Sequence, residues 1–190
     1  MWLVPLALPA TFALLAGCAK PTGEPTALVL MKEADRFVGE QIKGRIVQLR
    51  SDKSIGGLTP SVWFVAYHDP DAPFKVTEVK FGAGQKLEVT RPLRVLELVT
   101  GSDTLLDQTR IKLDSDQALK VAAAEPLLKP LKLTAAQLRL ENSADGPVWK
   151  VRLWAAKLKK PEEDASLGEV ILSADTRKVI QANLDIRNVE

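Results

Sequence analysis

Two segments of the chain carry apolar residues at the spacing of one helix face. In the first segment, small and aliphatic residues recur three or four positions apart, and Gly39 and Gly44 follow. The residues of this face are Ala27, Leu30, Met31, Ala34, Phe37 and Val38. This period is typical of an amphipathic helix, and glycines are common where a helix ends. We therefore predict a helix that begins near Ala27.

The second segment begins with a capping-box signature. Asp114 precedes Gln117 by three residues, so each side chain can bond the other's backbone amide at the start of a helix. The apolar face continues through Ala118, Val121 and Ala122. Pro126 and Pro130 then end or break the helix, because proline lacks the amide hydrogen that an internal turn needs.

Each predicted helix is followed by segments that favour β-strands. The expected strands are 45–50, 62–67, 75–81 and 86–89 in the first set, and 137–141, 148–158, 169–173 and 178–184 in the second. Gly84 and the pair Asp175-Thr176 stand where tight turns are needed. A helix laid across an antiparallel sheet buries one stripe of the helix and one face of the sheet, so we expect an α+β fold.

The two sets resemble each other as an internal repeat. Matching residues occur in the same order at an offset of 86 to 91 residues. The pairs are Ala27-Leu28 with Ala118-Leu119, Gln48-Leu49-Arg50 with Gln137-Leu138-Arg139, Val62-Trp63 with Val148-Trp149, and Phe81 and Ala83 with Leu172 and Ala174. Such self-similarity indicates two tandem units, each a helix followed by an antiparallel sheet.

The second unit resembles the PepSY family, a cystatin-like α+β module. "IKLDSDQALKVA" is similar to the family's entry into its helix, "VWKVRLWA" to its central strand and "GEVILSADTRKVIQ" to its closing hairpin. Ala174-Asp175 precedes that hairpin's turn, and Arg177-Lys178 stands where the family commonly has glycine. The resemblance implies a binding role. PepSY-like modules restrain secreted peptidases as propeptides or occur in envelope proteins, and the family has no established catalytic residues.

The N-terminus has the pattern of an export signal. Residues 1–17 contain no charged side chain, and the run is shorter than the about 20 residues of a membrane-spanning helix. Small residues close an apolar run in signal peptides. Leu15-Ala16-Gly17-Cys18 resembles the lipobox of bacterial lipoproteins, although a Lys or Arg near the start is missing.

The lipobox resemblance implies cleavage between Gly17 and Cys18, with acyl chains such as palmitate on Cys18. Two or more chains hold a protein firmly on a membrane. Because no Asp follows Cys18, the resemblance implies the outer membrane, facing the periplasm, if the organism is Gram-negative. The alternative is a free cysteine buried in an apolar N-terminal helix.

These patterns divide the chain into five parts. They are a signal peptide (1–17), a lipidated N-terminus with a short linker (18–25), a divergent first unit (26–92), a connector (93–109) and a second unit (110–190).

Composition narrows the function classes. The net charge of +2 is too small to indicate nucleic-acid binding. Cys18 is the single cysteine, so no disulfide can form within the chain. We expect no cofactor.

The one histidine lies in a charged turn. His68, Asp69 and Asp71 of "HDPDAP" can ligate a divalent ion, but Asp-Pro-Asp is typical of a hairpin tip, which we favour. We therefore expect no metal site, and His68 and Asp71 at an exposed loop tip. The acidic run 162–164 is interpreted as a solvated loop rather than an acid pair.

Three tryptophans bear on surfaces and packing. Trp63 and Trp149 occupy equivalent repeat positions, which favours burial in the core. Trp154 lies five residues after Trp149, so in a regular strand the two point to opposite faces. An outward Trp154 beside Tyr67 or Leu153 would mark a partner surface, although packing between the two units is an equal alternative.

Three functions follow from these patterns. The first is a lipid-anchored, non-catalytic module that binds a protein or peptide partner, for example by adding a peptide strand to its sheet. The second is an inhibitor or chaperone-like regulator of a secreted peptidase. The third, least favoured, is an envelope hydrolase that uses His68. An exposed apolar groove favours the first two, and a pocket that holds His68 with two carboxylates favours the third.

Overall fold

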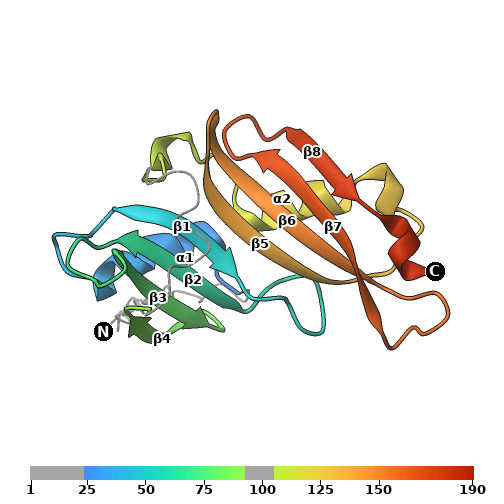
Figure 1. The fold of residues 1–190 in the computed structure, drawn as a ribbon, viewed down its shortest axis with the longest axis horizontal. Helices are drawn as coiled ribbons and strands as arrows, with labels where there is room; N and C mark the ends of the chain where they lie inside the picture. The colour runs from blue at the N-terminus through green and yellow to red at the C-terminus, as the bar shows by residue number, and fades with distance from the viewer. Residues whose placement is uncertain (1–23, 93–104) are drawn as a thin grey trace, which may run out of the picture.

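The computed structural model describes residues 24–92 and 105–190, which form one eight-stranded antiparallel sheet and two short α-helices (Figure 1). The strand order across the sheet is β4-β3-β2-β1-β5-β6-β7-β8. Both helices lie behind the sheet in the view of Figure 1, so one face is covered and the other is open. The α+β expectation is confirmed. Residues 1–17, Cys18 and most of the connector lie outside the described residues.

Each half of the described chain consists of one α-helix followed by four strands of the sheet. The elements of the first half are α1 (Ala27–Ala34), η1 (Asp35–Phe37), β1 (Ile46–Ser51), β2 (Val62–His68), β3 (Val76–Gly82) and β4 (Gln85–Thr90). Those of the second are η3 (Gln108–Arg110), α2 (Ser115–Ala123), η4 (Pro126–Leu128), β5 (Leu133–Ser143), β6 (Gly146–Ala156), β7 (Asp164–Ser173), β8 (Val179–Leu184) and η5 (Ile186–Val189). All eight predicted strands are present, and β5 and β7 are longer than expected.

The eight strands lie in one sheet because β1 pairs with β5. Gln48 lies opposite Glu141, Leu49 opposite Leu140 and Arg50 opposite Arg139. Beyond these three pairs, serine hydroxyls act as acceptors, while the Ser54 amide still donates to the Ala136 carbonyl at 2.8 Å. Ser51 Oγ accepts the amide hydrogen of Leu138 at 2.9 Å, and Ser54 Oγ accepts that of Ala136 at 2.8 Å.

The N-termini of the two helices meet. The Ala27 amide donates to Ser115 Oγ at 3.0 Å, and the Leu28 amide donates to Asp114 Oδ1 at 3.2 Å. Asp114 also caps its own helix through the Ser115 amide at 2.6 Å. The first amides of a helix have no partner within the helix, and Thr26, the N-cap of α1, makes no side-chain bond. Residues of the second half therefore cap the first helix.

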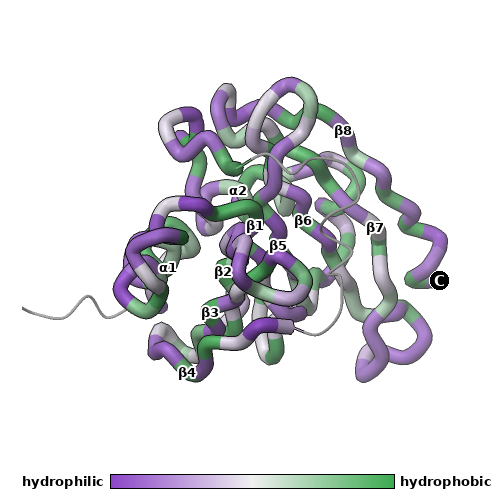
Figure 2. The backbone as a smooth tube through the Cα atoms, turned by 60° about the vertical axis from the view of Figure 1, so that its left-hand side comes forward, coloured by the Kyte–Doolittle hydropathy of each residue, from purple (hydrophilic) through white to green (hydrophobic). Residues whose placement is uncertain are grey.

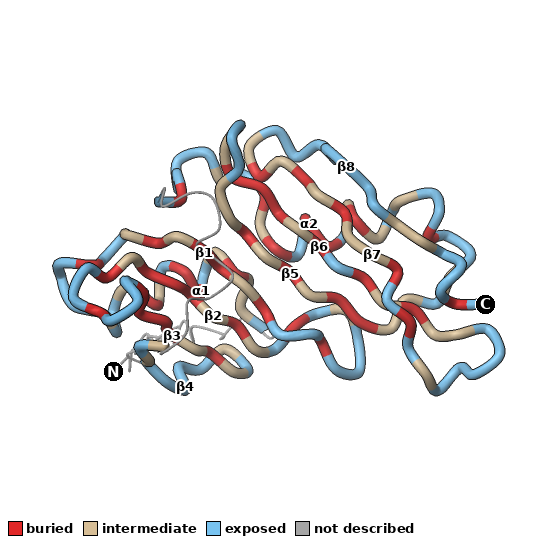
Figure 3. The backbone as a smooth tube through the Cα atoms, in the orientation of Figure 1, coloured by how far each residue is buried: buried red, intermediate tan, exposed pale blue. Residues whose placement is uncertain are grey.

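Alternation along the strands builds the core under the helices. Hydrophobic and hydrophilic residues follow one another along the strands in Figure 2, and buried and more exposed positions do so in Figure 3. Trp63 and Trp149 are both buried, as predicted. Trp149 is fully buried, and its Nε1 donates to the Leu113 carbonyl at 2.8 Å, which ties β6 to the entry of α2.

Two turns show how the chain reverses direction. Ala83 and Gly84 both have positive φ (+47° and +74°), the backbone of a tight two-residue hairpin between β3 and β4. On β7, Gly168 has φ of +112°, and a Cβ there would lie 2.1 Å from the Asn183 carbonyl oxygen. The absence of a side chain at Gly168 therefore lets β8 approach β7 closely.

Candidate functional site

The open face of the sheet carries Trp154. On β6, Trp154 lies opposite Ala135 of β5 and Ser166 of β7. Its side chain is on the face opposite the buried Trp149, as the odd spacing predicted. Lys53 Nζ lies 4.9 Å from the centroid of the Trp154 ring, and the same ammonium group contacts Asp164 at 3.2 Å. The Trp154 ring is therefore half-buried beneath a lysine from the β1–β2 loop.

The expectation that Tyr67 or Leu153 lies beside Trp154 on a partner surface is wrong, because both side chains are buried. Tyr67 is fully buried, and its hydroxyl lies 3.0 Å from Asp35 Oδ1 at the end of α1. Burial raises the pKa of the Tyr67 phenol, and the nearby Asp35 carboxylate raises it further. Tyr67 shares its face of β2 with Trp63, since residues four apart in a strand point the same way.

His68 is partly buried at the end of β2, which corrects its placement at an exposed loop tip. Its Nδ1 lies 3.0 Å from Arg45 Nη2. Asp71 is exposed, as expected. In the described ranges, no three or more His, Cys, Asp or Glu residues are grouped so that they can hold a metal ion.

Asp69 organises the turn that follows His68. Its side chain is buried and accepts hydrogen bonds from the Thr77 hydroxyl at 2.6 Å and the Asp71 amide at 3.0 Å, and Arg91 contacts it at 3.3 Å. Burial alone raises the pKa of Asp69, but these donors and the Arg91 charge hold it below the ordinary value. The carboxylate is thus occupied in shaping the turn.

Two residues of the acidic run 162–164, Glu163 and Asp164, form ion pairs with lysines rather than an acid pair. Glu163 contacts Lys157 at 2.6 Å and Lys160 at 3.0 Å, and these lysines lower its pKa. Asp164, which begins β7, contacts Lys53.

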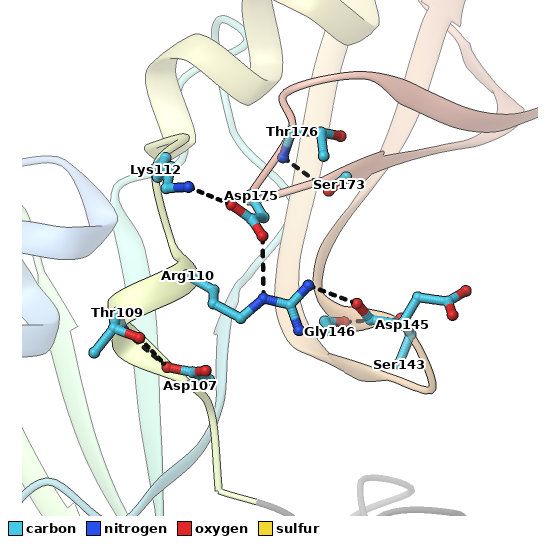
Figure 4. A network of polar contacts seen from close by, with 10 residues as sticks. All are labelled: Asp107, Thr109, Arg110, Lys112, Ser143, Asp145, Gly146, Ser173, Asp175 and Thr176. Carbon is cyan, nitrogen blue, oxygen red and sulfur yellow. Dashed lines mark hydrogen bonds and ion pairs between the residues drawn. The ribbon is translucent and has the colours of Figure 1, made fainter.

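A polar network joins the segment before α2 to the ends of two hairpins (Figure 4). Asp175 lies 2.7 Å from Lys112 Nζ and 3.0 Å from Arg110 Nε, and these two cations lower its pKa. Arg110 also donates to the Asp145 carbonyl at 2.8 Å. The network fixes the approach to α2 against the β5–β6 and β7–β8 turns.

An apolar groove lies beside the helix N-termini. It has a volume of about 300 Å³, and Leu58, Pro60, Trp63 and Leu119 contribute to its walls. His68 is not among its lining residues. The strand and helix patterns gave no indication of this groove, because it forms where the β1–β2 loop, residues 24–26 and α2 come together.

Two edge strands leave backbone groups without a neighbouring strand. β4 and β8 end the sheet, and both are mostly exposed (Figure 3). β4 contains Lys86 and Glu88, whereas the six residues of β8, VIQANL, include no charge, proline or glycine. On β8, Ile180 is 57% exposed.

In the described part of the chain, no helix is long and apolar enough to cross a membrane. Comparison of the chain with protein-family models, with curated proteins and with solved structures finds no match.

Proposed function

We propose that the chain is a lipid-anchored cell-envelope protein that binds an extended segment of a protein partner and carries out no catalysis. The proposed location in the cell envelope rests on the sequence of residues 1–18, which resembles a lipoprotein leader ending at Cys18. Restraint of a secreted peptidase is a special case of this function.

We also propose that the two halves are tandem PepSY-like units. The support is the element order, one α-helix followed by four antiparallel strands in each half. A second support is the β1–β5 pairing, where Arg50 lies opposite Arg139, its counterpart in the sequence repeat.

The β8 edge carries the binding proposal. An edge strand presents a row of unpaired amide and carbonyl groups, and natural proteins usually protect it with charges, proline or bulges. The register of each edge strand is interrupted once, at Leu87 on β4 and at Ile180 on β8. β4 also has charges within the strand, whereas β8 has none between Lys178 and Asp185. An extended, uncharged peptide segment can therefore add as a ninth strand, with main-chain bonds supplying affinity.

Ile180→Lys tests the binding proposal by placing a charge on the β8 edge. Leu87→Lys on β4 is the matched control, because Leu87 is 56% exposed against 57% for Ile180. Native membranes would be crosslinked and the adducts of each variant compared with those of the wild type. We expect the adducts to disappear with Ile180→Lys and to persist with Leu87→Lys, while circular dichroism shows that both variants fold. Adducts that persist in both variants, or vanish in both, would exclude β8 as the binding edge.

Cys18→Ala tests the anchor separately. The substitution removes the one thiol that can be acylated, so the protein should move from the membrane to the soluble envelope fraction. Membrane association of both forms with an uncut leader would contradict the lipoprotein assignment.

A further inference from the structure

Three cations stand side by side on the open face, in neighbouring strands. Arg50 on β1 lies opposite Arg139 on β5, and Arg139 lies opposite Lys150 on β6. Like charges directly opposite each other in a sheet are destabilising. The centre of the sheet therefore contains an arrangement that needs negative charge nearby.

Nearby carboxylates satisfy only part of this need. Glu78 accepts two hydrogen bonds from Arg50, at 3.0 and 3.2 Å. Glu141 contacts Lys150 at 2.5 Å and accepts from Gln48 at 3.0 Å. Arg139 lies 3.8 Å from Glu141, which is too long for a hydrogen bond.

The sheet is hollowed beside these cations. After the Arg50–Arg139 pair, β1 and β5 no longer pair directly. A small hollow of about 30 Å³ opens there, and Arg50, Arg139, Lys150 and Arg152 all line it, together with Glu169. It holds four basic side chains and one acidic one.

Some of the donors around this hollow have no hydrogen-bond partner in the described part of the protein. Within residues 24–92 and 105–190, Arg139 and Arg152 make no side-chain hydrogen bond, and Arg139 has only the 3.8 Å contact with Glu141. In the same ranges Arg50 Nε is buried without a partner, while Nη2 of its guanidinium donates to Glu78 and Cζ lies 3.8 Å from the centroid of the Phe64 ring. A guanidinium offers donors in a planar fork that matches the oxygens of a phosphate. Glu169 is the one carboxylate that lines the hollow, so the four basic side chains outnumber the acidic ones there.

We propose that this hollow binds a phosphate group, with Arg139 and Arg152 as the principal donors and Lys150 and Arg50 as supporting charges. The ligand is either a free phosphate-bearing molecule or an anionic phospholipid headgroup, since both present the same oxygens. The hollow lies in the middle of the sheet, and β8 lies at one end. Phosphate binding at the hollow and peptide binding at β8 can therefore be tested independently.

The test uses the full chain in micelles of a neutral detergent. Two ligands are titrated at constant ionic strength, inorganic phosphate in one arm and phosphatidylglycerol mixed into the micelles in the other. NMR shifts of the arginine Nε–Hε groups report binding at the hollow. We expect saturable shifts with at least one ligand, and an affinity at least tenfold weaker (about 1.4 kcal/mol) in Arg139→Gln. The exposed Arg177→Gln in the β7–β8 turn should bind as the wild type does.

The two arms identify the source of the phosphate. Saturation with inorganic phosphate points to a soluble ligand, and saturation with phosphatidylglycerol alone points to a membrane lipid. Saturation with neither ligand overturns the proposal, and so does equal weakening by Arg177→Gln, which would indicate nonspecific attraction.

Thermal stability separates a binding role from a structural one. Arg139→Gln removes the repulsion with Arg50, so in phosphate-free buffer its melting temperature should equal or exceed that of the wild type. A lower melting temperature with an unchanged phosphate response would overturn the proposal. Lys150→Gln serves as a second variant if Arg139→Gln fails to fold, and it should also weaken binding.

Discussion

Trp149→Ala should be among the most damaging single substitutions in this chain. The side chain is fully buried between the sheet and α2, and its Nε1 bonds the Leu113 carbonyl at 2.8 Å. Emptying a buried aromatic site costs about 3–5 kcal/mol. Losing the bond to a buried carbonyl adds about 1 kcal/mol. Small domains have about 5–15 kcal/mol of stability, so we expect a loss of about 4–6 kcal/mol to leave much of the chain unfolded at ambient temperature.

Trp154→Ala is the matched control, because it removes the same side chain from the same strand on the open face. There it loses a half-buried contact with Lys53, a cation–π interaction that contributes about 0.5–1 kcal/mol, and some packing area. Urea denaturation followed by far-ultraviolet circular dichroism measures both variants. A loss below about 1 kcal/mol for Trp149→Ala, or equal losses for the two, would refute the reasoning from burial.

Three further predictions concern polar contacts. Ser115→Ala should lower stability by about 1 kcal/mol, measured by denaturation, because the Ala27 amide loses its acceptor; an unchanged midpoint would mean that water caps α1 equally well. His68→Ala should cost no more than about 1 kcal/mol, since it removes one contact with Arg45, and a larger loss in the same assay would reopen a role for that turn. Because the pKa of Asp175 is lowered in the folded state, its carboxylate stabilises the fold at pH values above the ordinary pKa of 3.8. This contribution is lost as the pH falls through the folded-state pKa. Asp175→Asn should therefore lower the melting temperature at neutral pH and make no difference at the acid end; equal differences at both pH values would refute the assignment.

The sequence pattern predicted the elements well because their signals are local. Alternation located all eight strands, and the capping signature at Asp114 marked the start of α2. The same alternation also predicts the burial of Tyr67, in contrast to its expected place on a partner surface. Trp63 and Tyr67 are four residues apart in one strand, so an inward Trp63 requires an inward Tyr67.

The candidate sites could not be predicted because they depend on pairing between distant segments. Arg50 and Arg139 are ordinary outward-facing strand residues until the register of β1 against β5 places them opposite each other. The union of two sheets into one depends on that same pairing. The groove likewise joins Leu58, from a loop with no regular pattern, to Leu119 of α2.

The meeting of the two helix N-termini has a consequence for the order in which the chain becomes folded. Synthesis produces residues 26–92 first, when Asp114 and Ser115 are still absent and α1 has no acceptor for its leading amides. β1 at that stage also has one open side, which only β5 fills later. A ribosome-bound first half is thus incompletely folded and has an exposed strand edge, and it gains its last partners only when residues 114–143 emerge. The fold of the first half is therefore completed only once the second half is present.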